Sequence, residues 1–318
     1  MTTLKIHLFG GMRITHADWT DEVKMTPAVQ ALFAYLLLYR HRIHRREFLA
    51  NLFWGDYCDD RARGSLSTVL WRLRSALETG DTTRETYLLS TPMGDVGFND
   101  KSDHWLDVAV FEEQVNQIIS RPVQALEAHD IHKLENGIQL YAGELLEGFY
   151  DDWALRERER LRALHLKGLA HLMRIFSHNK AFEKSIAYGR QILHRDPLRE
   201  EIHRDVMRLY LESGQRSMAI QQYKTCCKIL DAELGIPPME ETQAVYSSIL
   251  EPSGHNQQQS NLTQSQCGNA SPETPDLDEA IQGLFKAKQH FEKSLGHFER
   301  AIKLLERIVS PPPGGHKR

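Results

Sequence analysis

Four arginines lie within one apolar stretch of the sequence, RARGSLSTVLWRLRSAL, at residues 61–77. Arginine side chains pair with phosphate oxygens and donate two parallel hydrogen bonds to a guanine edge. Small hydroxyl residues between the arginines let a helix approach a groove closely. The stretch contains no acidic residue, whereas a solvent-exposed helix usually carries both signs of charge. The chemistry predicted for this stretch is recognition of a polyanion.

The spacing of the apolar residues predicts one helix over residues 61–77. Its buried face consists of side chains that recur every three or four residues: Ala62, Leu66, Val69, Leu70, Leu73 and Leu77. The polar side then consists of two neighbouring stripes: Arg61, Ser65, Thr68, Arg72 and Ser75 in one, and Arg63, Ser67, Trp71 and Arg74 in the other. Taken alone, the pattern also fits a basic surface helix without a ligand.

The composition predicts a globular protein with two domains and a tail. The chain has 318 residues, 41% of them hydrophobic, and a formal net charge of −4. Although the net charge is small, positive charge is in local excess, because residues 40–74 contain eight arginines and only four acids. A local basic patch is sufficient for nucleic-acid binding.

The cysteines and the apolar runs indicate a cytoplasmic protein without a metal or a cofactor. None of the four cysteines forms a Cys-x-x-Cys pair, which fits a reducing compartment and no structural zinc. His41 and His44 form a His-x-x-His pair, but arginines flank it and no further ligand is evident. We find no secretory signal and no apolar run of membrane-spanning length, so we expect no membrane partner.

Residues 1–105 predict two strands, three helices and a second strand pair, in that order. LKIHLFGGMRI alternates around a Gly-Gly turn, which is typical of a hairpin. A first helix begins with Thr26 as N-cap and Pro27 in its first turn, and its expected buried residues are Ala31, Phe33, Ala34, Leu37 and Leu38. A second helix, RREFLANLF, is expected to bury Phe48, Leu49, Leu52 and Phe53.

The arginine helix comes third in this order. The loop WGDYCDD at 54–60 precedes it, and TYLLSTPMGDVGFN at 86–99 predicts two strands around a Pro-Met-Gly-Asp turn. Three helices followed by a hairpin are the order of a winged helix-turn-helix domain. In that fold the third helix enters the major groove and the hairpin wing lies along the DNA backbone.

Residues 106–251 predict an all-α tetratricopeptide-like domain. KSIAYGRQIL at 184–193 aligns with MAIQQYKTCC at 218–227, and Ile186 and Ile220 are 34 residues apart, which is the period of that repeat. Turn residues predict helix ends at Asp196-Pro197, at Glu212-Ser213-Gly214 and at Gly235-Ile236-Pro237-Pro238. The fold class is therefore mainly α, with β-structure confined to small hairpins.

The last part of the chain predicts a linker and a long amphipathic helix. Residues 252–275 are rich in Ser, Gln, Asn and Pro, which is typical of a disordered linker. Residues 276–310 carry an unbroken 4-3 apolar spacing that includes Leu277, Ile281, Leu284, Phe291, Leu295, Phe298, Ile302 and Leu305. This heptad favours a dimerising coiled coil. Small residues beside the apolar stripe leave a second possibility, a helix that caps the repeats.

The two-domain order resembles the SARP family, the antibiotic regulatory proteins of actinobacteria and their relatives, over about residues 4 to 251. YAGELLEGFYDDWALRERERL, DPLREEIHRDVMRLYLESGQRSMAIQQYK and LDAELGIPPMEET resemble segments of the family's bacterial transcriptional activation domain. REFLANLFWGD and the arginine helix resemble its winged helix of OmpR/PhoB type. The wing, STPMGDVGF, departs from the family because it lacks an aromatic Gly-Gly-Tyr-Arg-Leu-like run.

The resemblance implies an activator that binds promoter direct repeats as a pair and contacts RNA polymerase, so we expect a homodimer at least on DNA, localised at the nucleoid. The DNA-contacting residues it implies are Arg45, Arg46, Arg61, Arg63, Ser67, Thr68, Trp71, Arg72 and Arg74. Arg72 and Arg74 are expected at base edges, and Arg45 and Arg46 at phosphates. The implied polymerase-contacting loop contains Trp54, Asp56, Tyr57, Asp59 and Asp60.

An enzyme and a protein-binding scaffold are the alternatives to a DNA-binding activator. The sequence shows no nucleophile elbow, phosphate loop or Cys/His dyad, so we expect no enzyme. Asp151 and Asp152 precede a helix and are expected to cap it. The scaffold remains open, because tetratricopeptide grooves commonly bind proteins and a winged helix can serve as an interaction module.

Overall fold

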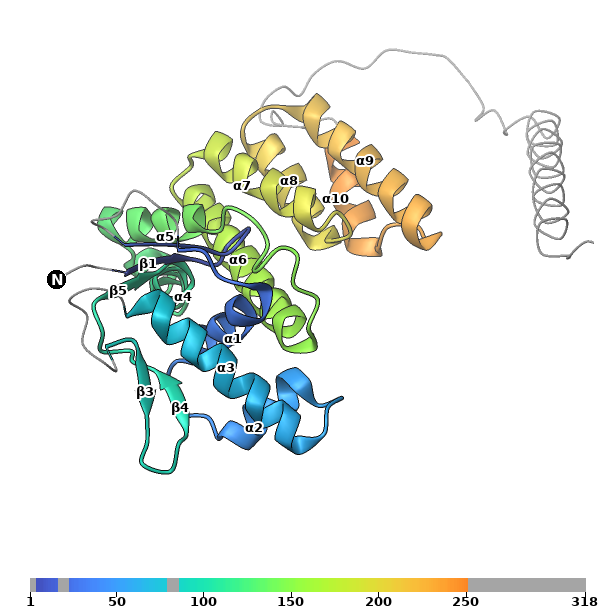
Figure 1. Ribbon diagram of the computed structural model, residues 1–318. Coiled ribbons are helices and arrows are strands. Elements are labelled where there is room, and N and C mark those ends of the chain that lie inside the picture. The colour runs from blue at the N-terminus through green and yellow to red at the C-terminus, as the bar shows by residue number, and fades with distance from the viewer. Residues whose placement is uncertain (1–3, 17–22, 79–85, 251–318) are drawn as a thin grey trace, which may run out of the picture. The chain divides into compact units, whose positions relative to one another are not determined.

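The chain begins with the predicted hairpin, which the structure extends into a three-stranded sheet (Figure 1). The structure is a computed structural model that describes residues 4–16, 23–78 and 86–250. Strands β1 (Leu4–His7) and β2 (Arg13–His16) pair antiparallel. Strand β5 (His104–Leu106) pairs parallel with β1 and gives the order β2-β1-β5. The sequence did not predict this third strand, which joins the two ends of the N-terminal domain.

Three helices follow the hairpin, as predicted. Helix α1 (Pro27–Leu38) starts after Thr26, although the Thr26 side chain forms no capping hydrogen bond. The helix is buried on more than the predicted face, because every residue from Ala31 to Leu38 is buried. Rings from other elements cover it; Tyr35, for example, packs against Phe53 and Trp153 with ring centroids 5.8 and 5.4 Å apart.

Helix α2 (Arg46–Trp54) corrects one prediction of burial. Phe48 is 49% exposed, and the buried residues of the helix are Leu49 and Ala50. Leu52 and Phe53 are half-buried. The Phe48 ring meets Tyr35 and His44 only at centroid distances of 6.4 Å, because it lies at the rim of the domain.

Helix α3 (Asp59–Leu77) begins two residues earlier than the arginine stretch. Asp59 and Asp60 therefore belong to its first turn rather than to the predicted loop. Carboxylates at this position stabilise the partial positive charge of a helix N-terminus. The loop between α2 and α3 is reduced to residues 55–58.

The wing is the antiparallel pair β3 (Leu88–Ser90) and β4 (Val96–Phe98), as predicted. The backbone of His44, just before α2, exchanges two hydrogen bonds with Val96, at 2.8 and 2.9 Å. The wing is thus joined by backbone bonds to the start of α2.

The remaining described residues form the predicted helical domain. Its elements are α4 (Asp107–Ile119), a short 3-10 helix η1 (Val123–Ala125), α5 (Ala128–Leu140), α6 (Asp152–His178), α7 (Phe182–Arg195), α8 (Glu200–Glu212), α9 (Arg216–Leu234) and α10 (Glu240–Leu250). Helices α7 and α9 carry the two aligned repeat segments, and α7, α8 and α9 end at the predicted turns. Gly235 closes α9 with φ +65°, a conformation that favours glycine. The mainly helical fold is confirmed.

The start of α6 differs in detail from the sequence expectation. Asp151 occupies the N-cap position, but its side chain makes no capping hydrogen bond. Arg158 donates to the carbonyl oxygens of Leu145, Leu146 and Phe149 at 2.8–2.9 Å. The charged run 156–162 therefore supports the preceding loop instead of only facing solvent.

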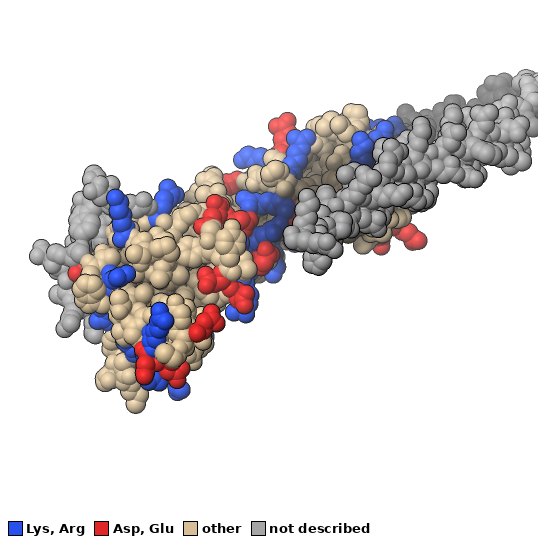
Figure 2. All heavy atoms as spheres, turned by 45° about the vertical axis from the view of Figure 1, so that its right-hand side comes forward, with Lys and Arg blue, Asp and Glu red and all other residues tan. Residues whose placement is uncertain are grey.

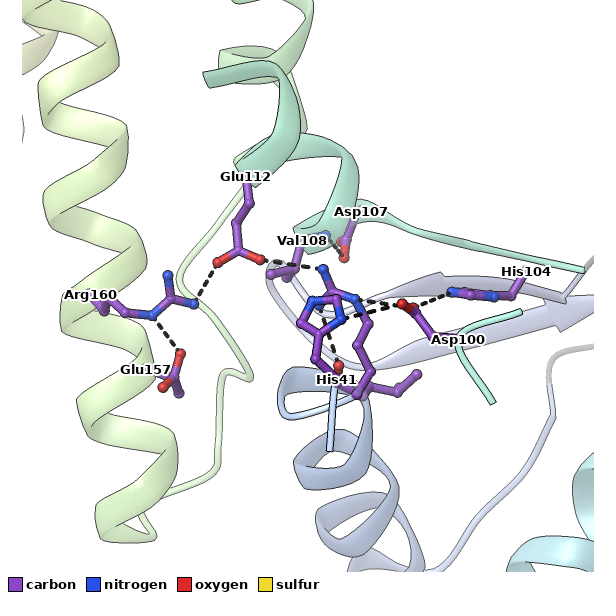
Figure 3. Close-up of polar contacts among 10 residues, drawn as sticks. His41, Asp100, His104, Asp107, Val108, Glu112, Glu157 and Arg160 are labelled. Atoms are coloured by element: carbon purple, nitrogen blue, oxygen red, sulfur yellow. Dashed lines mark hydrogen bonds and ion pairs between the residues drawn. The ribbon is translucent and has the colours of Figure 1, made fainter. Parts of the chain in front are cut away.

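Polar contacts connect the winged helix to the helical domain (Figure 3). Arg160 of α6 pairs with Glu112 of α4 at 2.6 Å, and Glu112 lies 3.8 Å from Arg40, in the turn after α1. Arg40 also pairs with Asp100, which has His41 and His104 as further neighbours. The described residues form one compact unit within Met1–Ser253. The linker and the heptad residues from Leu277 to Leu305 lie outside the described residues.

Candidate nucleic-acid interface

The buried face of α3 is the one that the spacing predicts. Its six buried residues are Ala62, Leu66, Val69, Leu70, Leu73 and Leu77. The opposite side exposes Arg61, Arg63, Ser67, Thr68, Trp71 and Arg72. Trp71 is 68% exposed, which is high for so large an apolar ring. The helix thus presents three guanidinium groups and an indole ring to solvent along one side.

The middle of this exposed side carries short polar side chains that rise little above the helix backbone. The hydroxyl groups of Ser67 and Thr68 donate to the carbonyl oxygens of Arg63 and Gly64, at 2.8 and 3.0 Å. Both side chains therefore lie close to the helix. A Cβ atom at Gly64 would meet nothing within 4 Å, so the space above that residue is open. A flat, open strip between arginines is a surface that a DNA groove can approach.

Arg74 differs from the other arginines of α3. It is half-buried, and its Nη2 donates to the Ser90 hydroxyl of β3 at 2.5 Å. This bond joins the C-terminal half of α3 to the wing. The sequence pattern could not reveal the partner, because Ser90 lies outside the helix.

Arg45 and Arg46 lie at the start of α2. Arg45 is exposed at the N-cap position. Arg46 is half-buried, and its Nη2 donates to the Ser67 hydroxyl at 2.8 Å. A Cβ atom on Gly94, in the turn of the wing, would lie 3.4 Å from Cδ of Arg46. Arg46 therefore lies between α3 and the tip of the wing.

The predicted polymerase-contacting segment is mostly exposed. Asp56, Asp59 and Asp60 face solvent, and Tyr57 is 44% exposed. The Arg61 guanidinium lies over the Tyr57 ring, 4.6 Å from its centroid. Trp54 is half-buried and lines two hollows, one beside Gly64 and Thr68 and the other beside residues 147–151.

Comparison with known proteins finds one matching domain family and two similar proteins. Residues 106–250 match the bacterial transcriptional activator domain family. Transcriptional regulatory protein MoaR1 of Mycobacterium bovis is 26% identical over 235 residues, which cover 71% of this chain and 72% of the relative. The Mycobacterium tuberculosis protein of the same name is 25% identical over the same shares. Residues 106–250 thus carry a bacterial transcriptional activator domain, and the chain is similar to SARP-like transcriptional regulators.

A solved structure supports the fold of this regulator. The structure of Mycobacterium tuberculosis EmbR in complex with a low affinity phosphopeptide matches with a TM-score of 0.66. The match has 19% sequence identity and covers 79% of the regulator, which spans 65% of the solved chain. At this sequence identity, the structural similarity indicates a shared fold. The two chains therefore share one fold over the matched residues.

Several basic residues of the regulator have structural partners. Arg40 is bound to Asp100 and Glu112, and Arg42 lies over the Tyr39 ring at 4.6 Å. Figure 2 shows basic and acidic side chains interleaved over the face that it presents. The local excess of arginine between residues 40 and 74 therefore overstates the charge available to a ligand. The arginines that remain available to a ligand are the exposed ones of α3 and Arg45.

The His-x-x-His pair of the regulator does not form a ligand set. His41 lies 3.3 Å from Asp100, whereas His44 is 4% exposed and burial lowers its pKa. Among the described residues no cluster of three or more His, Cys, Asp or Glu side chains is arranged to hold a metal ion. In the same residues, no helix combines the length and the apolar character needed to cross a membrane.

Proposed function

We propose that this regulator binds promoter direct repeats in duplex DNA through α3 and activates transcription by contacting RNA polymerase. The observation that supports this most strongly is the exposed side of α3, where Arg61, Arg63 and Arg72 flank a flat strip without acids. Cations on a helix in the third position of a winged helix-turn-helix face the major groove.

Four of the arginines have a proposed role that follows from their surroundings. Arg72 is exposed and unencumbered by any ion pair among the described contacts, so we assign it to a base edge. Arg45 and Arg46 contact phosphate. Arg46 keeps free donors for this, because a guanidinium has five N–H groups and one is given to Ser67. Arg74 positions the wing through its hydrogen bond to Ser90. We therefore propose that Arg74 holds the wing against α3 and does not contact a base edge.

RNA polymerase and a second copy of the chain are the proposed protein partners. Trp54 with Asp56, Tyr57, Asp59 and Asp60 offers an aromatic and acidic surface that suits a basic surface of polymerase. Residues 276–310 pair two copies through their heptad. A chain that ends at Leu250 then has the mass of a monomer by light scattering, and the full chain that of a dimer.

Selection of bound duplexes from a random DNA pool, at physiological salt and with the full chain, tests the DNA-binding proposal. We expect enrichment of a short motif in direct repeat, with the repeats about one helical turn apart. Recovery of duplexes without a common motif would reject sequence-specific binding and favour the scaffold.

The salt dependence of binding, measured with the same full chain, distinguishes DNA binding from the protein-binding scaffold. Binding through several phosphates weakens steeply with salt, by about one decade of affinity per decade of salt for each phosphate neutralised. Binding of a protein to the helical repeats has no such slope.

A further inference from the structure

The wing of this regulator lacks the charge that would hold it on a phosphate backbone. Residues 86–99 contain no Lys or Arg and one acid, Asp95. Met93 lies at the tip of the turn. It is 92% exposed, more than any other large apolar side chain among the described residues. Pro92 beside it is also exposed. The tip of the wing is therefore apolar where a cation would be needed for a phosphate contact.

The turn that carries Met93 is held in one conformation. The backbone N–H of Gly94 donates to the Thr91 carbonyl at 2.8 Å, and that of Thr91 donates to the Asp95 carbonyl at 3.0 Å. The Thr91 hydroxyl accepts a third bond, from the Asp95 N–H, at 3.1 Å. Gly94 has φ +88°, which only glycine adopts without strain. An exposed side chain on an ordered turn loses little backbone entropy on binding.

The tip is also fixed relative to α3. Arg46 lies against Gly94 on one side and donates to Ser67 of α3 on the other. The bond from Arg74 to Ser90 joins the strand below the tip to the same helix. Two arginines therefore fix the wing beside α3, and Gly94, the neighbour of Met93, lies within one arginine side chain's length of Ser67.

We propose that Met93 enters the minor groove as an apolar wedge, and that the wing reads the deformability of a base step instead of the charge of the backbone. The proposal rests on the proposed function, since it requires α3 in the neighbouring major groove. Apolar side chains, Met and Pro among them, insert between base steps and bend the duplex. Pyrimidine–purine steps unstack most easily, so the wedge favours such a step beside the bases that α3 contacts.

The experiment uses the full chain and the duplex that the random-pool selection enriches, with a dye at each end to report bending. Met93→Ala and Met93→Leu are compared with the wild type. Met239→Ala is the matched control, because Met239 is 60% exposed and lies just before α10 in the helical domain. All of these side chains are exposed, so the melting temperatures should be equal, and this is measured first.

Met93→Ala is expected to weaken binding about tenfold, since it removes most of the apolar surface that the wedge buries. Its salt slope stays unchanged, because no phosphate contact is lost, and its duplex is straighter than that of the wild type. Met93→Leu retains the affinity within about twofold, and Met239→Ala equals the wild type. Replacing the pyrimidine–purine step by a stiff A-tract weakens the wild type and leaves Met93→Ala nearly unaffected.

Wild-type affinity and bending in Met93→Ala would overturn the wedge. So would an equal loss in Met93→Leu and Met93→Ala, because an apolar wedge does not require sulfur. These outcomes leave α3 as the reading helix, since the wild type would still prefer the selected motif. If selection enriches no motif, the proposed function fails together with the wedge, and the two failures are therefore distinguishable.

Discussion

At the scale of single residues, one buried carboxylate joins the N-terminal sheet to the first helix of the helical domain. Asp107 is 2% exposed and accepts hydrogen bonds from the backbone N–H groups of Leu8, Phe9 and Val108 at 2.7–3.0 Å. Burial raises the pKa of this carboxyl, and the hydrogen bonds act in the opposite direction. The sequence cannot reveal these contacts, because Phe9 and Leu8 precede Asp107 by 98 and 99 residues.

Asp107→Ala should therefore be strongly destabilising. It leaves three buried N–H donors without an acceptor, at a cost of about 1–3 kcal/mol each, so we expect the free energy of unfolding to fall by at least about 3 kcal/mol. Urea denaturation measures this. Asp56→Ala, on an exposed loop, is the control and should change the same quantity by less than about 0.5 kcal/mol. Equal effects of the two substitutions would contradict this role of Asp107.

At the scale of elements, α3 shows what a sequence can and cannot reveal. Its buried face was predicted in full, because contacts repeated every three or four residues are a local property of a helix. The partner of Arg74 and the exposure of Phe48 were not predicted, because both depend on how elements pack together. The third strand of the sheet was missed for the same reason, since β5 pairs with a strand about a hundred residues earlier.

Gly64→Ala tests whether the open strip on α3 is a DNA-binding surface. Glycine inside a helix costs about 1 kcal/mol relative to alanine, and nothing lies within 4 Å of the new methyl group. We expect the melting temperature to rise while affinity for the selected duplex falls, because the methyl group stands where the groove approaches. Thermal denaturation and duplex titration measure the two effects. A more stable variant with undiminished affinity would show that the strip is not in contact with DNA.

At the scale of the molecule, the winged helix and the helical repeats share one core in the described residues. Trp153 of α6 packs on rings from α1 and α2, and the Tyr39 hydroxyl donates to Glu157 at 3.1 Å. The sequence predicted two domains in order but not these contacts, because residues that meet across the junction lie far apart in the chain. The proposed recognition helix therefore belongs to a packed unit larger than the winged helix itself.

The measurement that tests the central claim most directly is a titration of the selected duplex, and of a scrambled one, with Arg72→Ala. Arg174→Ala is the control, because Arg174 is an equally charged, exposed residue of α6 in the helical domain. We predict that Arg72→Ala loses about 10–100-fold in affinity for the selected duplex and much of its preference over the scrambled one, since a base contact is worth about 1–3 kcal/mol. Arg174→Ala should bind as the wild type does. Unchanged affinity and preference in Arg72→Ala would contradict the assignment of α3 as the helix that reads DNA.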